Sequence, residues 1–166
     1  MIMQADKPKM RKDRLKKMAD FLETQVKSKW FNLRIVASRG FSNRECGSAA
    51  CVMGWTPAVF PNSGAELFDD NSGDDHPYDF RYNGKSDFEA AELFYGLDEK
   101  QTHWLCNPYK YTEHSRGRMS VVRRLRYLVK HGDMPESDRD RPIYSIFCGR
   151  VFGHPAPARR RPATTT

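Results

Sequence analysis

The sequence of 166 residues lacks most of the features that would define a function directly. It has no run of 18 apolar residues, so no membrane-spanning helix is expected. Its basic N-terminus lacks the apolar stretch of a signal peptide. Its four cysteines include no C-x-x-C pair and its five histidines are scattered, so no metal or cofactor is expected. We therefore expect a cytoplasmic protein with reduced thiols and no membrane partner.

The length is typical of one domain with flexible ends. We predict a flexible N-terminus over residues 1–8, a single helical domain over 9–152 and a disordered basic tail over 153–166. The predicted fold is mainly α, a compact bundle of about five helices. It contains a long acidic loop over residues 62–85, which includes a possible small β-hairpin.

Small and apolar residues dominate the stretch C-G-S-A-A-C-V-M-G-W, which we expect to be the centre of the core. Ser48 is a suitable N-cap, so a short buried helix is predicted to start after it and to end or turn at Pro57. Small side chains there would let another element approach closely. We assign a structural role to the motif residues Cys46, Gly47, Ser48, Cys51, Gly54 and Trp55.

Cys46 and Cys51 are five positions apart, a poor interval for metal chelation. We interpret them as buried thiols that pack as small apolar side chains. A disulfide between them, or a metal site completed by a distant histidine, stays open as an alternative.

This stretch resembles the signature C-G-[ST]-x-x-C-x-x-G-[WH] of a family of small bacterial and phage proteins. The resemblance extends, in pieces, over about Trp30 to Val129. It includes the earlier segment W-F-N-L and a later pattern of the form A-x-x-x-F-G-L-[ST]-x-x-Q-x-x-x-L-F-x-P, matched here by Ala91, Gly96, Leu97, Gln101, Leu105 and Pro108. The chain departs from that pattern at Asp98 and Cys106. The resemblance implies a phage or bacterial context and carries no assigned activity.

Helical spacing of apolar residues predicts a helix from Lys9 to about Lys29. Residues 31–36 alternate as in a short strand, with a continued helix as the competing interpretation. In the acidic loop, aromatic residues alternate before Asn83-Gly84, a strong signal for a tight hairpin turn. The aspartates of this loop do not follow the register of a calcium-binding EF-hand loop.

Two capping boxes, S-D-F-E from Ser86 and D-E-K-Q from Asp98, predict two short helices that meet at Gly96. The second helix carries no basic surface, so we interpret the pair as a structural corner rather than a DNA-binding helix-turn-helix.

The last strong helix is predicted from about Glu113 to His131, with Gly132 as its stop. One face is apolar and the adjoining face collects basic side chains. We predict a binding surface from that face together with the basic tail: Arg116, Arg123, Arg126, Lys130, Arg159, Arg160 and Arg161. The alternative is internal: residues 62–101 contain 11 acidic and three basic residues and could neutralise the face.

Three functions follow, in order of preference. The first is a non-enzymatic, phage-encoded accessory protein that binds a host or viral macromolecule, such as a protein with an acidic surface. The second is a DNA- or RNA-binding protein that uses the basic helix face. The third is a metal-dependent enzyme that uses Cys46, Cys51, His76 or the acidic loop. The sequence leaves the oligomeric state open.

Overall fold

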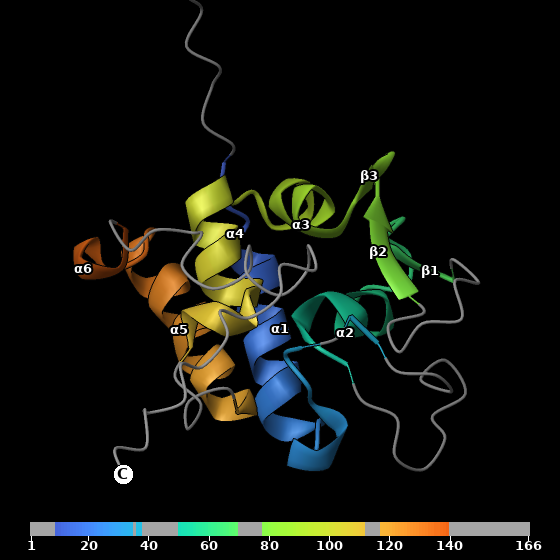
Figure 1. Cartoon of the computed structure of the whole chain (residues 1–166), viewed down its shortest axis with the longest axis horizontal. Helices are drawn as coiled ribbons and strands as arrows, with labels where there is room; N and C mark the ends of the chain where they lie inside the picture. The colour runs from blue at the N-terminus through green and yellow to red at the C-terminus, as the bar shows by residue number, and fades with distance from the viewer. Residues whose placement is uncertain (1–8, 35, 38–49, 70–77, 112–116, 140–166) are drawn as a thin grey trace, which may run out of the picture.

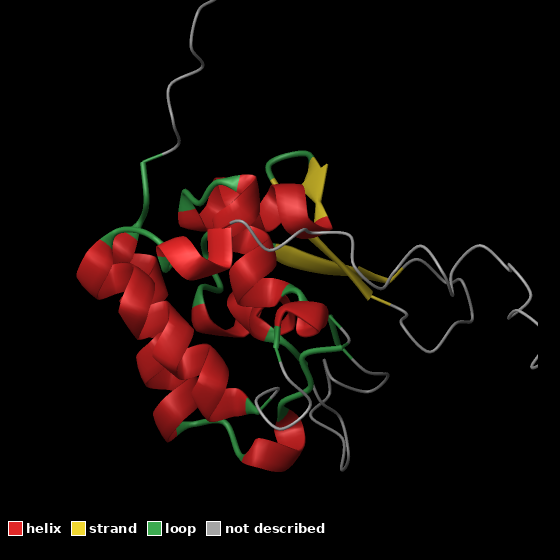
Figure 2. Cartoon of the chain, turned by 60° about the vertical axis from the view of Figure 1, so that its left-hand side comes forward, coloured by secondary structure: helices red, strands yellow, loops and turns green. Residues whose placement is uncertain are grey.

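The computed structural model describes residues 9–34, 36–37, 50–69, 78–111 and 117–139. This part of the chain is 59% helical, with six α-helices and a three-stranded antiparallel sheet. Figure 2 shows the helices forming one body with the sheet packed at its side. The mainly helical fold is therefore confirmed. The predicted ends, residues 1–8 and 153–166, lie outside the described residues.

The first and last long helices lie side by side as an antiparallel pair, with two shorter helices and the sheet on the other side of the first long helix (Figure 1). Helix α1 spans Lys12–Thr24, shorter than predicted, and α5 spans Arg118–His131, ending at Gly132 in the left-handed conformation as expected. Arg118, at the start of α5, contacts carbonyls near the end of α1. The two apolar stripes face each other and are buried: Leu15, Met18, Ala19 and Leu22 with Val121, Val122, Leu125 and Leu128.

Helix α2, Val52–Val59, is the expected short buried helix, but its start was predicted wrongly. Ala50 forms β-bridges with Phe31 and Ala37, so the backbone is extended until Cys51, the N-cap. Ser48 lies outside the described residues. Pro57 does not end the helix either. Pro57 lacks a backbone N–H, so the helix has one hydrogen bond fewer. The helix still continues to Val59, whose side chain is buried in the core.

Gly54 confirms the predicted close approach. A Cβ atom at Gly54 would lie 1.8 Å from the backbone oxygen of Val36 and 2.6 Å from the Cβ of Ala50. No side chain fits in that space, so the glycine lets residues 36–37 lie directly on α2. Phe31 and Ala37 form isolated bridges to Ala50, and the described residues around them form neither the strand nor the longer helix considered above. They follow a short 3-10 helix, η1, Ser28–Trp30.

The corner of α3, Asp87–Tyr95, and α4, Glu99–Cys106, was predicted largely correctly. Asp98 forms a full capping box with Gln101, and Gly96 ends α3 with φ +65°. Ser86, in contrast, makes no capping hydrogen bond. It belongs to strand β3, where it pairs with Arg81, and Asp87 turns the backbone into the helix at φ 48°.

The sheet consists of β1, Glu66–Asp69, β2, Tyr78–Tyr82, and β3, Lys85–Ser86. The Asn83-Gly84 hairpin is confirmed, with both residues at positive φ. Strand β1 was not predicted and pairs antiparallel with β2, Leu67 opposite Phe80. The predicted loop over 62–85 is therefore partly strand. Further along the chain lie the 3-10 helix η3, Pro108–Lys110, and α6, Glu136–Arg139. None of the described helices combines the length and apolarity that a membrane span requires.

Candidate functional site

Helix α5 carries five basic residues, and the structure separates them into two groups. Arg124 lies on the flank that faces α4, here called the α4-facing flank. Its guanidinium donates to the carbonyl of Trp104 and, at 2.6 Å, to that of Lys110. It also stacks over the ring of Tyr111, with 3.6 Å between the guanidinium carbon and the ring centroid. Arg124 therefore joins the end of α4 and η3 to α5.

Two other arginines bind helix ends in the same way. Arg118 donates to the carbonyls of Leu22 and Glu23, at 2.5 and 2.6 Å, in the last turn of α1. Arg14 donates to the carbonyl of Phe94, at 2.8 Å, in the last turn of α3. The carbonyls of a last turn have no partner within their own helix and carry partial negative charge. Each of these cations is therefore placed to stabilise the fold.

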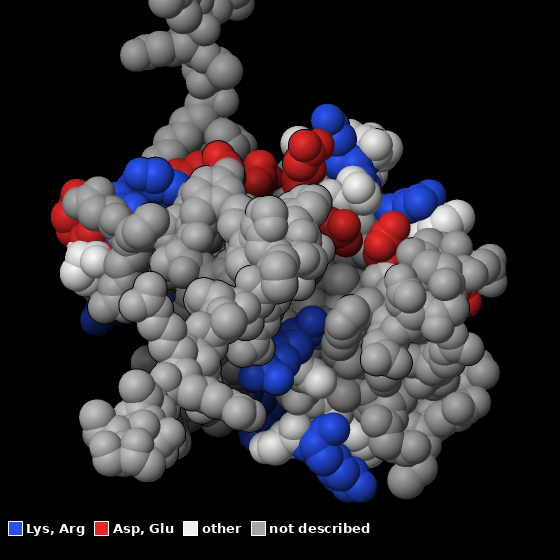
Figure 3. All heavy atoms as spheres, viewed as in Figure 1, with Lys and Arg blue, Asp and Glu red and all other residues white. Residues whose placement is uncertain are grey.

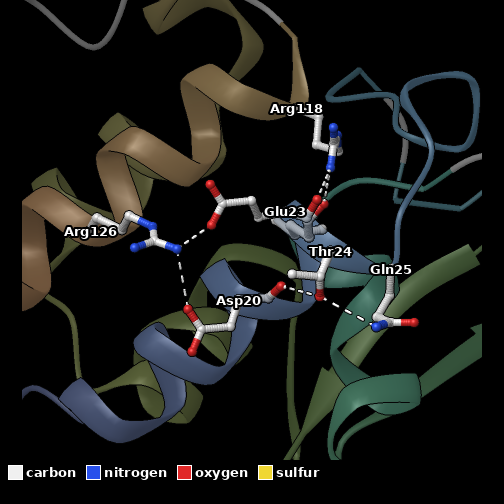
Figure 4. A network of polar contacts seen from close by, with 7 residues as sticks. Asp20, Glu23, Thr24, Gln25, Arg118 and Arg126 are labelled. Carbon is white, nitrogen blue, oxygen red and sulfur yellow. Dashed lines mark hydrogen bonds and ion pairs between the residues drawn. The ribbon is translucent and has the colours of Figure 1, made fainter.

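Arg126 lies on the opposite flank of α5 and contacts α1 (Figure 4). It forms ion pairs with Asp20, at 3.3 Å, and with Glu23. The acidic partners of Arg126 thus lie on α1. Residues 70–77 of the acidic segment and Arg116 lie outside the described residues, so the internal alternative stays a prediction for the rest of the face. Half of the Arg126 side chain is exposed, so water and salt weaken these pairs.

Arg123 and Lys130 share the flank of Arg126, because residues three and four positions apart lie on one helix face. This is the α1-facing flank. Both side chains are exposed. Arg123 donates to the hydroxyl of Ser120 at 3.0 Å, and no described acidic residue pairs with either cation. Arg116 and the tail residues Arg159, Arg160 and Arg161 lie outside the described residues.

Helix α1 contributes to the same surface. Its flank toward α5 carries Lys12 and Lys16 beside the two acids that bind Arg126, at helical spacing. We call the combined surface the α1–α5 seam. Its bases are Lys12, Lys16, Arg123, Arg126 and Lys130, and its acids are Asp13, Asp20 and Glu23. The seam therefore has a modest positive charge.

Charge is divided more sharply over the molecule as a whole. Residues 9–34 and 118–131 together carry 14 basic and three acidic side chains. The other described residues carry five basic and 11 acidic ones. In Figure 3 acidic atoms line the upper edge near α3 and α4, while basic atoms dominate the lower part of the described surface. Partial burial and then the neighbours Glu99, Glu89 and Asp98 raise the pKa of Glu92, as expected in an acidic cluster.

The described cysteines do not form a reactive centre. Cys51 and Cys106 are free and buried. Burial raises the pKa of Cys51 to about 11 and that of Cys106 well above its ordinary value, so both are neutral thiols at pH 7. No group of three or more possible metal ligands occurs among the described residues. Because Cys51 is free, the structure does not contain the disulfide between Cys46 and Cys51 considered above. Cys46 and His76 lie outside the described residues, so the metal alternative stays a prediction.

Comparison of the chain with protein-family models, with curated proteins and with solved structures gave no match. The family resemblance seen in the cysteine motif therefore remains a prediction.

The sequence interpretation missed the three arginines that bind helix ends. Arg14 and Arg118 contact carbonyls 80 and 96 residues away, and no local pattern encodes such contacts. One signal was present: α1 and α3 have no basic residue in their own last turns. A helix without such a residue can receive one from elsewhere in the chain.

Proposed function

We propose that this chain is a non-enzymatic binding protein whose partner is a nucleic acid. The observation that supports the proposal best is the division of charge. The two most basic described segments, 9–34 and 118–131, are adjacent in space through the antiparallel pair of α1 and α5. A polyanion is the ligand that such a surface attracts over the longest distance.

The proposal takes into account the cations already used by the fold. Arg14, Arg118 and Arg124 bind carbonyl groups, and Arg126 binds acids of α1. The cations that remain for a ligand on the seam are Lys12, Lys16, Arg123 and Lys130. Arg123 and Lys130 are seven residues apart, about 10 Å along the helix axis. This surface makes phosphate contacts without an evident means of reading base edges, so binding should depend little on sequence.

An acidic protein surface, from the host or from a virus, is the second candidate. It is favoured by the mixed charge of the seam, where Asp20 and Glu23 lie beside the cations. Such alternation is more typical of a protein–protein contact than of a phosphate-binding surface. The predicted phage origin and cytoplasmic location belong to the same hypothesis and need their own tests.

The test measures binding of the full chain to DNA and RNA of random sequence by fluorescence anisotropy over a range of salt concentrations. We expect the logarithm of the binding constant to fall linearly with the logarithm of salt concentration. Absence of binding at about 50 mM salt would contradict the proposal. Purification of the chain from nuclease-treated bacterial lysate then tests the second candidate. A single acidic protein, retained at a salt concentration that releases nucleic acid, would favour it.

A further inference from the structure

A short segment after α1 combines positive charge with an aromatic ring. Residues 27–34, here called the Trp30 loop, contain three bases and no acid. Phe31 and Leu33 point into the core, with 9% and 4% of their surface exposed. The basic side chains are exposed instead: Lys27, Lys29 and Arg34. The loop therefore anchors itself with apolar side chains and presents cations to solvent.

Trp30 is the most accessible of the three tryptophans. Trp55 and Trp104 are 8% and 4% exposed, whereas Trp30 is half-buried at the edge of the core. The ammonium groups of Lys27 and Lys29 lie 5.1 and 5.9 Å from the centroid of its ring. Both ammonium groups lie over the indole as cation–π partners. A base that stacks on the ring would take their place there, and the two released cations could contact the adjoining phosphates.

The backbone of the loop is held in place on both sides of the ring. The Trp30 N–H donates to the carbonyl of Lys27 at 2.9 Å, and the Trp30 carbonyl accepts from Ala50 at 3.1 Å. Asn32 donates to the carbonyl of Ala50 at 3.2 Å, and its side chain accepts from the N–H of Arg34 at 2.9 Å. Because the backbone on both sides of Trp30 is already ordered, a ligand that binds here does not have to order it.

The loop also lies at the basic end of the molecule. It follows the C-terminus of α1, the point at which Arg118 attaches the start of α5 (Figure 4). A strand that runs along the α1–α5 seam would thus reach the Trp30 loop at one end. Duplex bases are stacked on each other and are not available to an exposed ring, whereas unpaired bases are.

We propose that the Trp30 loop is a stacking site for an unpaired base, which makes the chain a binder of single-stranded nucleic acid. This inference rests on the proposed function and specifies its ligand. Trp30 supplies the stacking surface. Lys27 and Lys29 contact the phosphates on either side of the stacked base.

The experiment uses the full chain with a fluorescent oligothymidylate of about 20 nucleotides and a duplex of the same length. Single-strand binding should be stronger than duplex binding. Trp30→Ala should weaken single-strand binding about tenfold, as expected from the loss of one stacked base, and leave duplex binding within about twofold. Trp30→Phe, which keeps an aromatic ring, should restore most of the affinity. The double variant Lys27→Gln with Lys29→Gln should lose two phosphate contacts. The slope of the logarithm of the binding constant against the logarithm of salt concentration should then be smaller by about 1.4.

The sheet provides a matched control. Phe68 is 42% exposed and the guanidinium of Arg81 lies 3.4 Å from its ring centroid, but two acids, Glu66 and Asp79, flank this pair in the strand register. Phe68→Ala should leave binding unchanged. A second measurement covers the possibility that Trp30→Ala fails to fold. The oligonucleotide should quench the tryptophan fluorescence of the wild type, and Trp30→Phe should bind without that quenching, because Trp55 and Trp104 are buried.

The outcomes separate the two proposals. If the wild type binds neither form of nucleic acid, both fail. Suppose instead that it binds both forms equally, that binding needs Arg123 and Lys130, and that Trp30→Ala has no effect. The proposed function then stands and the stacking site is refuted. Quenching that persists in Trp30→Phe would refute it as well.

Discussion

The two flanks of α5 carry the same type of residue and use it differently. On the α4-facing flank, Arg124 is half-buried and bonded to two carbonyls. On the α1-facing flank, Arg123 and Lys130 are exposed, and Arg126 forms an exposed ion pair. Arg123 and Arg124 are adjacent in the chain, yet their side chains point to different surroundings. The number of basic residues on a helix therefore overestimates the charge available to a ligand, because some of these side chains bind carbonyls or carboxylates within the protein.

The largest effect should come from Arg124→Gln. The variant removes a charged donor from the carbonyls of Trp104 and Lys110 and leaves both partly buried. We expect the free energy of unfolding to fall by about 2–3 kcal/mol, measured by urea denaturation. Nucleic-acid affinity at a temperature where the variant is folded should change little. A stability equal to that of the wild type would contradict the assigned difference between the flanks.

Arg118→Gln should have the next largest effect. It removes the donor to the last turn of α1, where part of the site is open to water, so we expect a loss of about 1–2 kcal/mol. Hydrogen exchange of amides in the last turn of α1 should speed up more than that of α4. Equal acceleration in both helices would show that the variant acts globally.

Arg123→Gln with Lys130→Gln tests the opposite flank. On single-stranded nucleic acid we expect affinity to fall about tenfold and the salt slope to drop by about 1.4, from the loss of two phosphate contacts. The unfolding free energy should stay within about 0.5 kcal/mol of the wild type. Lys85→Gln with Lys100→Gln makes the same change in net charge away from the seam and should change binding much less. If both double variants lose the same affinity, only the net charge matters and the seam is not a defined surface.

Arg126→Gln should have a small effect on stability, about 0.5 kcal/mol, because its ion pairs are exposed. A double-mutant cycle with Glu23→Gln measures the coupling directly, and we expect less than about 1 kcal/mol. A larger coupling energy would place Arg126 with the arginines that hold the fold together. The sequence prediction that Arg126 belongs to the binding surface would then be wrong.

The smallest predicted effect is on the pH dependence of stability, and it comes from His103 on α4. Burial lowers the pKa of His103 on α4, which stacks on Phe88 with 4.4 Å between the ring centroids. The unfolded chain therefore takes up a proton at higher pH than the folded chain does. Stability should fall as pH falls through about 6.5, the ordinary value for histidine. In His103→Gln the denaturant concentration at the unfolding midpoint should depend less on pH between about pH 7.5 and 5.5 than it does in the wild type. Most carboxylates titrate below this range.

The sequence predicted the elements whose signals are local. The apolar stripes of α1 and α5, the Asn83-Gly84 turn and the capping box of Asp98 each lie within a few residues, and the structure confirms all three. Gly54 was also correctly assigned to a close contact.

The errors come from distant contacts. Strand β1 is only four residues long, too short for a clear alternating pattern, and is defined by its pairing with β2. The start of α2 is set by the bridges of Ala50 to Phe31 and Ala37, and not by a capping serine. The prediction of the candidate surface missed a distant contact as well. Spacing placed Arg123, Arg126 and Lys130 together correctly, but it could not show that Arg126 is paired with α1.

The pairing of α1 with α5 has a consequence for folding during synthesis. The carbonyl of Leu22 and the guanidinium of Arg118 that binds it are 96 residues apart. At about 5–20 residues per second, α1 leaves the ribosome roughly 5–20 s before α5 exists. During that time the side chains of Leu15, Met18 and Leu22 lack α5, the helix that makes the most extensive contact with α1. Helix α1 is therefore synthesised first but reaches its final packing only after α5 has been synthesised. A nascent chain that stops before Arg118 would expose the apolar stripe of α1 to chaperones and proteases.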